Sequence, residues 1–216
     1  MTRAETRGRF ITFEGADGVG KSTQIAAFTE RLASEGADVL TVREPGGTRI
    51  GERIRDLLLD AKNAEMTDTT ELLLYEAARA QIVAEVIMPA LEAGTTVVCD
   101  RFYDSTTAYQ SFGRGIDRAT VDLLNAIGSA GLTPDLTILL DMPTDSSYER
   151  ATRETADRLE AAGLDFQQRV CDGFRALAFE QPERIVLVDA SGTPEDVAAR
   201  VWAIYTSHRG EKDVTR

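Results

Sequence analysis

The sequence Gly-Ala-Asp-Gly-Val-Gly-Lys-Ser at residues 15–22 matches the pattern of a phosphate-binding loop, or P-loop. An apolar run at 10–13 precedes it and an amphipathic stretch follows it, which is the strand, loop and helix context that the pattern requires. Glycines permit positive φ angles and close approach of backbone N–H groups to phosphate, and the N-terminus of the next helix favours an anion. The loop therefore predicts a nucleoside triphosphate site, with Lys21 on the β- and γ-phosphates and the Ser22 hydroxyl on Mg²⁺. The residues expected to hold the triphosphate are Gly15, Ala16, Asp17, Gly18, Val19, Gly20, Lys21, Ser22 and Thr23.

Composition limits the class of protein. At 216 residues the chain is long enough for one α/β domain with a substantial core. Its net charge of −12 and isoelectric point near 4.6 argue against a nucleic-acid-binding surface, which carries a basic patch. Two cysteines, Cys99 and Cys171, are too few for a disulfide framework, and no apolar segment typical of an export signal follows the N-terminus. Because no apolar run approaches ~18 residues, we expect a cytoplasmic protein without a membrane span.

Apolar periodicity divides the chain into alternating strands and helices. We expect strands at 10–14, 37–42, 95–99, 136–140 and 184–188. Helices are predicted at 21–34, 48–60, 68–93, 105–111, 117–129 and 193–208, with a largely helical segment at 148–181 and a late kink at Pro89. This alternation predicts an α/β fold, a doubly wound parallel five-stranded sheet flanked by helices. The expected boundaries are a flexible N-terminus at 1–9, a single domain at 10–208 and a flexible tail at 209–216.

The residues after the third predicted strand discriminate among classes of P-loop protein. A switch GTPase requires Asp-x-x-Gly there and an Asn-Lys-x-Asp motif for guanine, whereas this chain reads Asp100-Arg101-Phe102-Tyr103 and has no such guanine motif. An ATPase motor usually places acidic residues in tandem at this point. One aspartate beside one arginine suits a Mg²⁺ water ligand and an acceptor phosphate, which favours a kinase of a small phosphorylated substrate. Another nucleoside monophosphate or deoxynucleoside kinase, and a regulatory module that binds ATP without a small acceptor, are the alternatives.

Further motifs follow the P-loop in a fixed order. They are Arg43-Glu44-Pro45-Gly46-Gly47, Leu57-Leu58-Leu59, Ala77-Ala78-Arg79-Ala80-Gln81, Asp100-Arg101-Phe102, Ser105 to Gln110, Gly113-Arg114-Gly115-Ile116-Asp117 and Pro134-Asp135-Leu136-Thr137. With these motifs the chain resembles, over residues 9–207, the bacterial thymidylate kinases of the nucleoside monophosphate kinase family. The resemblance implies a P-loop kinase fold with a short lid, and transfer of the ATP γ-phosphoryl group to dTMP, giving dTDP and ADP, in dTTP synthesis. It also implies Mg²⁺ as cofactor, ATP and dTMP as ligands, and a homodimer.

Positive charge must gather where two anionic substrates react, because charge spreads over the transferred oxygens. A unit charge about 5 Å from a phosphate contributes roughly 3 kcal/mol at an effective dielectric of about 20, so a few arginines outweigh a distant and screened negative net charge. The candidates are Lys21, Arg43, Arg79, Arg101, Arg150, Arg153 and Arg158. By resemblance, Arg101 binds the acceptor phosphate, and Asp100 holds Mg²⁺ through water, with Ser22 as the other metal ligand. The expected catalytic residues are Lys21, Arg101, Arg153 and Asp17.

The dTMP site is predicted from several short segments. An acid inside a P-loop is unfavourable unless it faces another group, and by resemblance Asp17 accepts a hydrogen bond from the sugar 3′-hydroxyl. Arg43, Glu44 and Pro45 resemble the segment that meets the sugar and phosphate, and Glu44–Pro45 is a candidate for a cis peptide bond. The other residues expected at dTMP are Tyr75, Arg79, Arg101, Thr106, Tyr109 and Gln110.

Tyr75 and Arg79 lie four residues apart on one face of a predicted helix. A ring there can stack on a pyrimidine while a guanidinium donates to its edge. A donor aimed at thymine O4 rejects cytosine, whose exocyclic amine is also a donor, because buried polar groups would be left unpaired. By resemblance, Tyr109 stands where a ribose 2′-hydroxyl would clash.

The segment at about 150–160 resembles the lid of the bacterial enzymes, in which arginines close over ATP. Some relatives carry an arginine at the P-loop position that Gly18 fills here, so the contact with the transferring phosphoryl group must come from elsewhere. The segment is slightly shorter than the family pattern, which leaves the register between Arg150 and Arg153 open. We assign Arg153 to the transferring phosphoryl group, Arg150 to the ATP base and phosphates, and Arg158 to lid packing or substrate contact. A solvated helix with paired charges is the alternative.

Overall fold

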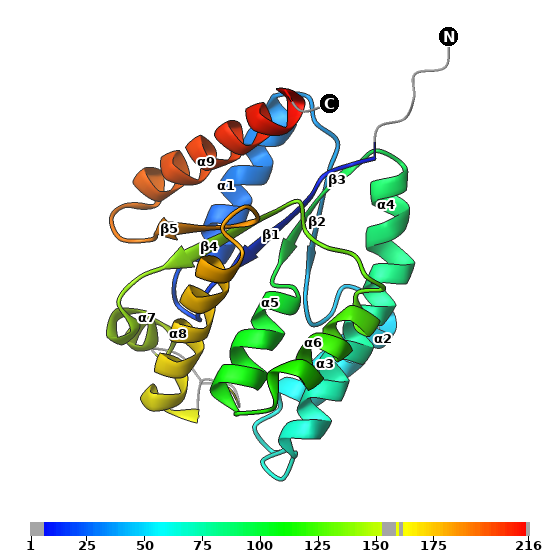
Figure 1. Ribbon diagram of the computed structural model, residues 1–216, viewed down its shortest axis with the longest axis vertical. Helices are drawn as coiled ribbons and strands as arrows, with labels where there is room; N and C mark the ends of the chain where they lie inside the picture. The colour runs from blue at the N-terminus through cyan, green and yellow to red at the C-terminus, as the bar shows by residue number, and fades with distance from the viewer. Residues whose placement is uncertain (1–6, 153–158, 160–161, 215–216) are drawn as a thin grey trace.

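The computed structural model describes residues 7–152, 159 and 162–214 (Figure 1). Its elements in chain order are β1 (Phe10–Glu14), α1 (Lys21–Ser34), β2 (Val39–Arg43), α2 (Arg49–Leu59), α3 (Asp68–Ile82), the π-helix η1 (Val83–Ile87), α4 (Met88–Glu92), β3 (Thr96–Asp100), α5 (Tyr103–Thr106), the π-helix η2 (Thr107–Gly113), α6 (Arg118–Gly128), β4 (Leu136–Asp141), α7 (Thr144–Ala151), α8 (Leu164–Glu180), β5 (Ile185–Asp189) and α9 (Pro194–Val214). The sheet has the strand order β2-β3-β1-β4-β5 with every pairing parallel, so the predicted fold class is confirmed.

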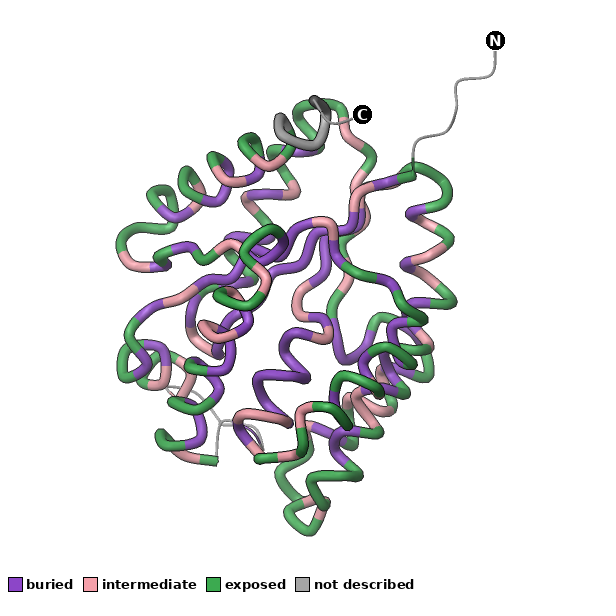
Figure 2. The backbone as a smooth tube through the Cα atoms, viewed as in Figure 1, coloured by how far each residue is buried: buried purple, intermediate pink, exposed green. Residues whose placement is uncertain are grey.

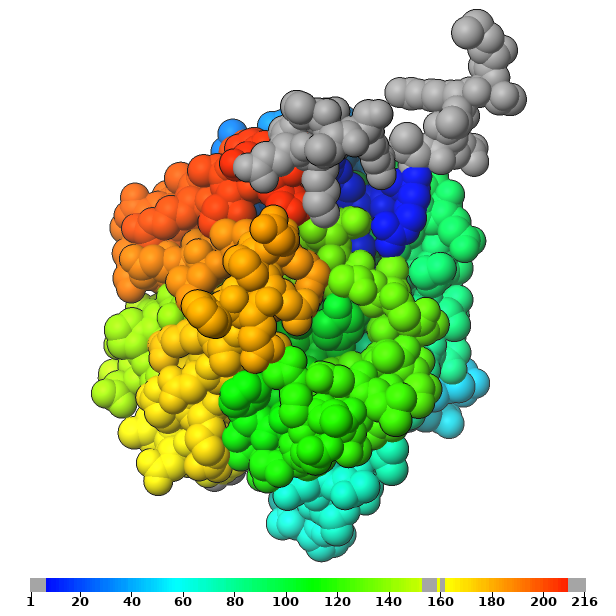
Figure 3. All heavy atoms as spheres, in the orientation of Figure 1, coloured from blue at the N-terminus to red at the C-terminus, as the bar shows by residue number. Residues whose placement is uncertain are grey.

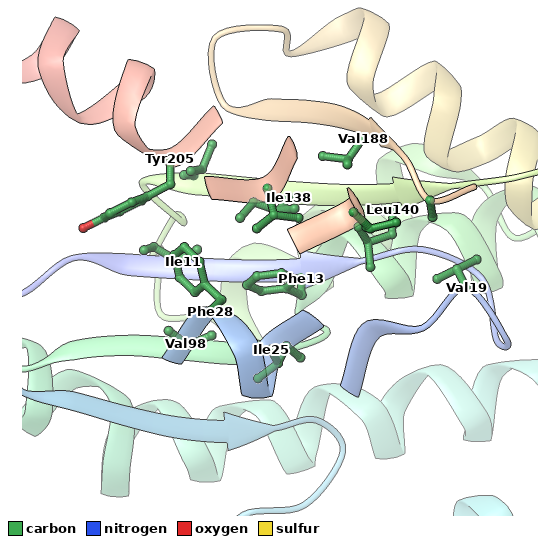
Figure 4. Packing of buried hydrophobic residues seen from close by; sticks show 14 of the residues in the cluster. Ile11, Phe13, Val19, Ile25, Phe28, Val98, Ile138, Leu140, Val188 and Tyr205 are labelled. Atoms are coloured by element: carbon green, nitrogen blue, oxygen red, sulfur yellow. The ribbon is translucent and has the colours of Figure 1, made fainter. Parts of the chain in front are cut away.

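One face of the sheet is covered by α1 and α9. Ile11 and Phe13 of β1 point toward Ile25 and Phe28 of α1, as Figure 4 shows. The rings of Phe28 and Tyr205 of α9 meet edge-on with their centroids 5.1 Å apart. Because β1 lies at the centre of the sheet, all five of its residues are buried, whereas β2 lies at an edge and is half-exposed (Figure 2).

The other face carries two groups of helices. The continuous stretch α3, η1 and α4 packs through Ile82, Ile87 and Leu91 on Phe10 of β1 and its neighbours in β3. Next to it, η2 packs against α8, and these segments lie side by side on the surface in Figure 3. Helices α2 and α6 pack on α3 from outside the sheet. No helix in the described part of the chain has the length and hydropathy needed to cross a membrane.

Several predicted boundaries were wrong. The helix predicted at 68–93 is divided by the wide π-turn of η1, which begins at Val83 and so lies before the expected kink at Pro89. Proline has no N–H and its ring clashes with the carbonyl four residues earlier, so the turn before Pro89 widens instead of bending at it. The helix predicted at 105–111 is α5 followed by η2, and α9 continues past the predicted end at residue 208 to Val214. Gly8, placed in the predicted flexible N-terminus, is buried and donates its N–H to Leu91 O at 2.8 Å.

Parallel strands bring their carboxyl ends to one edge of the sheet. In the register of the sheet, Asp100 at the end of β3 lies beside Phe13 on one side and beside Arg43, the last residue of β2, on the other. The P-loop follows β1 at this same edge. Open α/β sheets bind ligands at the carboxyl ends of their strands, so this edge is where the site is expected.

Candidate active site

The P-loop needs its glycines. Gly15, Gly18 and Gly20 have φ angles of 134°, 80° and 92°, a region that residues with a Cβ rarely adopt. A Cβ on Gly15 would also lie 2.3 Å from Leu140 O, so β4 closes one side of the loop. Gly20 precedes the first turn of α1, and Ser22 and Thr23 are exposed at that helix N-terminus. The loop therefore presents backbone N–H groups and hydroxyls where a phosphate chain can bind.

Lys21 is buried under the loop. Its Nζ donates to Gly15 O at 3.1 Å and to Ala16 O at 2.8 Å. Burial lowers the pKa of Lys21 to about 8, with help from the nearby charge of Arg101 and against the attraction of Asp17. An anion bound in the loop would favour the charged form of this lysine.

Asp17, Arg101 and Tyr109 form a hydrogen-bonded triangle at the mouth of the loop. Arg101 Nη2 donates to Asp17 Oδ1 at 2.5 Å and to the Tyr109 hydroxyl at 3.3 Å, and that hydroxyl donates to Asp17 Oδ2 at 2.9 Å. Burial raises the pKa of Asp17, but Arg101, Lys21 and the two hydrogen bonds outweigh it and bring the pKa to about 2. Asp17 is therefore ionised and acts only as an acceptor.

Arg79 is 1% exposed and lies in a buried polar cluster. Its Nε donates to Glu44 Oε2 at 2.8 Å, and its Nη1 donates to Glu76 Oε1 at 2.6 Å and to Asn125 Oδ1 at 3.2 Å. Its Nη2 donates to Thr106 Oγ1 at 2.8 Å. Among the described residues these contacts use four of the five N–H groups of a guanidinium, and the fifth belongs to Nη2. Burial raises the pKa of Glu44 to about 7, although Arg79 opposes this.

Two hollows adjoin at the carboxyl edge of the sheet. The first, which we name the acceptor pocket, is lined by Pro45 and by Tyr75, Arg79, Thr106, Tyr109 and Gln110. The second, the phosphate cleft, is lined by Gly18, Gly20, Lys21, Ser22, Arg43 and Asp100. Both hollows are also lined by Asp17, Glu44, Arg55 and Arg101. A group bound in the first hollow can therefore approach a group bound in the second across Asp17 and Arg101.

Every residue that the sequence predicted to contact dTMP lines one or both of the two hollows. The Glu44–Pro45 peptide bond is cis, as expected. Arg43 is exposed and its Nη2 donates to both carboxylate oxygens of Glu52, at 3.0 and 2.8 Å. Gln110 Nε2 donates to Glu71 Oε1 at 2.9 Å, which turns the carbonyl end of the carboxamide away from Glu71.

Arg55, which lines the acceptor pocket, and Glu71, which lies behind Gln110, were not predicted. Arg55 of α2 donates from Nη1 to Pro45 O at 2.9 Å and lines both hollows. Its position one turn before Leu59 on a helix that begins beside the Arg-Glu-Pro-Gly-Gly segment was a usable signal. Glu71 is fully buried against Gln110 and Arg114, and the local sequence gives no sign of this pairing.

The residues predicted to bind Mg²⁺ fit such an ion. Asp100 and Ser22 both line the phosphate cleft, and Asp100 Oδ1 is a buried oxygen that has no hydrogen-bond partner among the described residues. Among residues 7–152, 159 and 162–214, no group of three or more His, Cys, Asp or Glu residues could form an all-protein cage for a metal. One carboxylate and one hydroxyl, with phosphate oxygens and water as the other ligands, match the usual coordination of Mg²⁺.

The predicted lid is only partly described. Arg153 and Arg158 lie outside the described residues. Arg150 is exposed near the end of α7. Helix α7 packs directly on the P-loop, because a Cβ on Gly18 would lie 2.2 Å from Ser147 O and 2.9 Å from Ala151 N. An arginine at position 18 would therefore displace α7. Helix α7 ends at Ala151, so the lid segment follows directly from a helix that packs on the P-loop.

A parallel α/β sheet with a P-loop, and an acceptor pocket that adjoins the phosphate cleft, define a P-loop kinase of a small phosphorylated substrate. The thymidylate kinase family model matches residues 13–201. The chain is 49% identical over 199 residues to the thymidylate kinase of Trichlorobacter lovleyi, covering 89% of this chain and 94% of that protein. It is 50% identical over 195 residues to that of Synechococcus sp. (strain JA-2-3B'a(2-13)), covering 90% and 93%. The crystal structure of thymidylate kinase from Ehrlichia chaffeensis superposes with a TM-score of 0.77 at 32% identity, covering 92% of this chain and 99% of that one.

This chain therefore belongs to the thymidylate kinase family, whose members are phosphotransferases that phosphorylate dTMP. The resemblance found in the sequence is confirmed.

Proposed function

We propose that the protein transfers the γ-phosphoryl group of ATP to dTMP, giving dTDP and ADP. The observation that carries this proposal is the wall shared by the two hollows, in which Arg101 and Asp17 touch both. ATP placed in the phosphate cleft and dTMP placed in the acceptor pocket bring their phosphates together at Arg101. Such positioning supplies most of the catalysis in phosphoryl transfer.

On the donor side, the P-loop amides and Lys21 hold the β- and γ-phosphates. Mg²⁺, held by Ser22 and through water by Asp100, would neutralise charge on the donor phosphates when bound. Arg101 binds the acceptor phosphate, and Arg55 is well placed to assist it because it also lines both hollows. A lid arginine completes the neutralisation of charge in the transition state. We retain Arg153 for this role, with Arg150 at the ATP base and phosphates.

On the acceptor side, the base lies between Tyr75 and the residues around Arg79. The fifth N–H of Arg79 donates to thymine O4, and the carbonyl oxygen of Gln110 accepts from thymine N3–H. Cytosine has an amine in the place of thymine O4, and its N3 carries no proton. Both contacts would therefore fail. Asp17, which is ionised, accepts from the sugar 3′-hydroxyl, and Tyr109 excludes a ribose 2′-hydroxyl.

We also propose that the protein is a cytoplasmic homodimer, as its family resemblance implies. The neighbouring helices α2, α3 and α6 expose large apolar side chains, of which Leu123 and Ile127 of α6 are 62% and 65% exposed. A second copy seated on this face would bury them. Sedimentation equilibrium should show a dimer, and Ile127→Glu should yield a monomer. Phe179→Glu on α8, at an 88% exposed site on a helix outside this set of three, is the matched control and should remain dimeric.

A coupled assay of ADP release across dTMP, dUMP, dCMP, AMP, UMP and thymidine tests the proposed function. We expect dTMP to give the highest kcat/KM, with dUMP reduced only by the missing methyl contact, about 10- to 200-fold. Preference for thymidine over dTMP would support a deoxynucleoside kinase. Preference for another monophosphate would mean a different nucleotide kinase. Absence of acceptor-dependent turnover would support a regulatory module.

A further inference from the structure

Glu14 is a buried carboxyl group with no role in the proposed chemistry. It is the last residue of β1, is 0% exposed and is not among the residues that line the two hollows. Among the described contacts its oxygens accept from neutral donors, Oε1 from the Phe102 N–H at 2.7 Å and Oε2 from the Ser105 hydroxyl at 2.5 Å. Burying a carboxyl group is unfavourable, so its presence at this point requires an explanation.

Both partners of Glu14 belong to the turn that carries Arg101. The backbone of Arg101 has a φ angle of 68°, in the left-handed region that residues with a Cβ avoid. Such a conformation persists only where the surroundings hold it. The backbone N–H of Arg101 donates to Phe13 O at 3.0 Å, and the backbone N–H of Phe102 donates to Glu14. Two hydrogen bonds to β1 therefore bracket Arg101 and fix its backbone.

The same carboxyl group also acts on the Arg101 side chain. The Ser105 hydroxyl that donates to Glu14 accepts from Arg101 Nη1 at 3.0 Å. Arg101 Nη1 additionally donates to Gly15 O at 2.9 Å, at the start of the P-loop. Because the Ser105 hydroxyl is hydrogen-bonded to Glu14 and accepts from Arg101 Nη1, it links the carboxyl group to the guanidinium.

We propose that Glu14 is a positioning residue that sets both the backbone and the guanidinium of Arg101 for binding the acceptor phosphate. This inference rests on the proposed role of Arg101. Burial raises the pKa of Glu14 to about 8, with a contribution from Asp104 and against the hydrogen bond of Ser105 and the charge of Arg101. When Glu14 is neutral, Oε1 still accepts from the Phe102 N–H and the proton lies on Oε2, so the bond to Ser105 runs from Oε2 to the Ser105 Oγ. A glutamine side chain imitates this form with its amide oxygen and N–H.

Variants of Glu14 separate positioning from general stability. Glu14→Gln keeps an oxygen that accepts from the Phe102 N–H and supplies an amide N–H that donates to Ser105 Oγ, so its dTMP KM should stay within about threefold of wild type. Glu14→Ala should raise the dTMP KM by about tenfold or more, with the ATP Kd nearly unchanged. Thr12→Val is the matched control, because Thr12 lies on the same face of β1, is 0% exposed and pairs with Thr137 at 2.8 Å rather than with Phe102 or Ser105. It should lower stability without raising the dTMP KM.

A double-mutant cycle makes the inference falsifiable. If Glu14 acts through Arg101, the Glu14→Ala change should add no more than about twofold to the dTMP KM in an Arg101→Ala background. Full additivity, an equal KM rise in Thr12→Val, or a defect in Glu14→Gln as large as that in Glu14→Ala would overturn the inference. Should Glu14→Ala fail to fold, Ser105→Ala breaks the same link and must raise the dTMP KM. If the wild-type protein phosphorylates dTMP but these variants behave like wild type, only the positioning role of Glu14 is contradicted. If the wild-type protein does not phosphorylate dTMP, the proposed function is contradicted.

Discussion

The Nε atom of Arg79 lies 2.8 Å from Oε2 of Glu44, so helix α3 is joined directly to the segment that follows β2. This buried ion pair fixes the guanidinium at the acceptor pocket, together with Glu76 and Thr106. Although burial opposes it, the two carboxylates raise the pKa of Arg79 above its usual value, so the group is always charged. The pair thus holds a rigid donor at the acceptor pocket, where we propose that the base binds.

We predict that Arg79→Lys raises the KM for dTMP by about tenfold or more and leaves the KM for ATP nearly unchanged, because a lysine retains charge but loses the planar fork. Arg79→Ala should act in the same direction and more strongly. It also leaves Glu44 and Glu76 unpaired, at a cost of about 3–5 kcal/mol in stability. Steady-state kinetics on folded protein, checked by circular dichroism, measures both. Equal effects on the two substrates would contradict a role at the base.

Asp17→Asn should impair the use of dTMP while ATP binding stays largely intact. The amide removes the charge that pairs with Arg101 and one of the two acceptor oxygens available to the sugar hydroxyl. ATP affinity measured by calorimetry, beside the KM for dTMP, distinguishes the two sides of the loop. A selective loss of ATP affinity would place the action of Asp17 on the donor side.

Stability should depend on pH through Glu14. Its pKa is raised from 4.5 to about 8 by burial first and by Asp104 second, so the folded state binds a proton that the unfolded state releases above pH 4.5. Its contribution is therefore fully favourable below pH 4.5 and is lost as pH rises to 8, at up to about 1.4 kcal/mol per pH unit. Glu14→Gln removes this slope.

Urea unfolding of wild type and Glu14→Gln between pH 5 and pH 8.5 tests this. The charged groups near Glu14 that could complicate the curve are Asp104, Arg101, Lys21 and Arg184, and they are common to both proteins. We expect the variant to gain stability relative to wild type as pH rises. Parallel curves would show that Glu14 does not titrate in this range.

Arg153→Ala should lower kcat by at least about 10²-fold with little change in the ATP Kd, because a contact made only to the transferring phosphoryl group contributes in the transition state. Arg150→Ala should chiefly weaken ATP binding. Single-turnover kinetics isolates the chemical step. A large defect in Arg150→Ala beside a normal Arg153→Ala would reverse the assignment.

The sequence predicted what depends on local pattern. The five apolar runs became five parallel strands in the expected class of fold, since strands alternating with helices permit few other arrangements. The π-turns η1 and η2 were missed because they arise from Pro89 and from packing against α8, which leave no mark on hydrophobic periodicity.

In the candidate site, the sequence predicted the residues that belong to recognisable motifs. It did not predict the residues whose role depends on a partner far away in the chain. Tyr109 and Gln110 were predicted to contact dTMP, and both line the acceptor pocket. Glu71 and Glu14 were not singled out, because their partners Gln110 and Ser105 lie far along the chain. The ligand contacts themselves stay predictions.

Calorimetric titration with a bisubstrate ligand, adenosine and thymidine joined at their 5′ positions by five phosphates, tests most directly whether the two hollows bind the two substrates side by side. A chain of this kind spans the phosphate cleft and the acceptor pocket at once and gains effective concentration at the second site. We expect this ligand to bind about 10²-fold or more tighter than dTMP, with 1:1 stoichiometry and complete loss of both ATP and dTMP binding. A ligand that displaces only one substrate, or binds no more tightly than that substrate alone, would contradict this expectation.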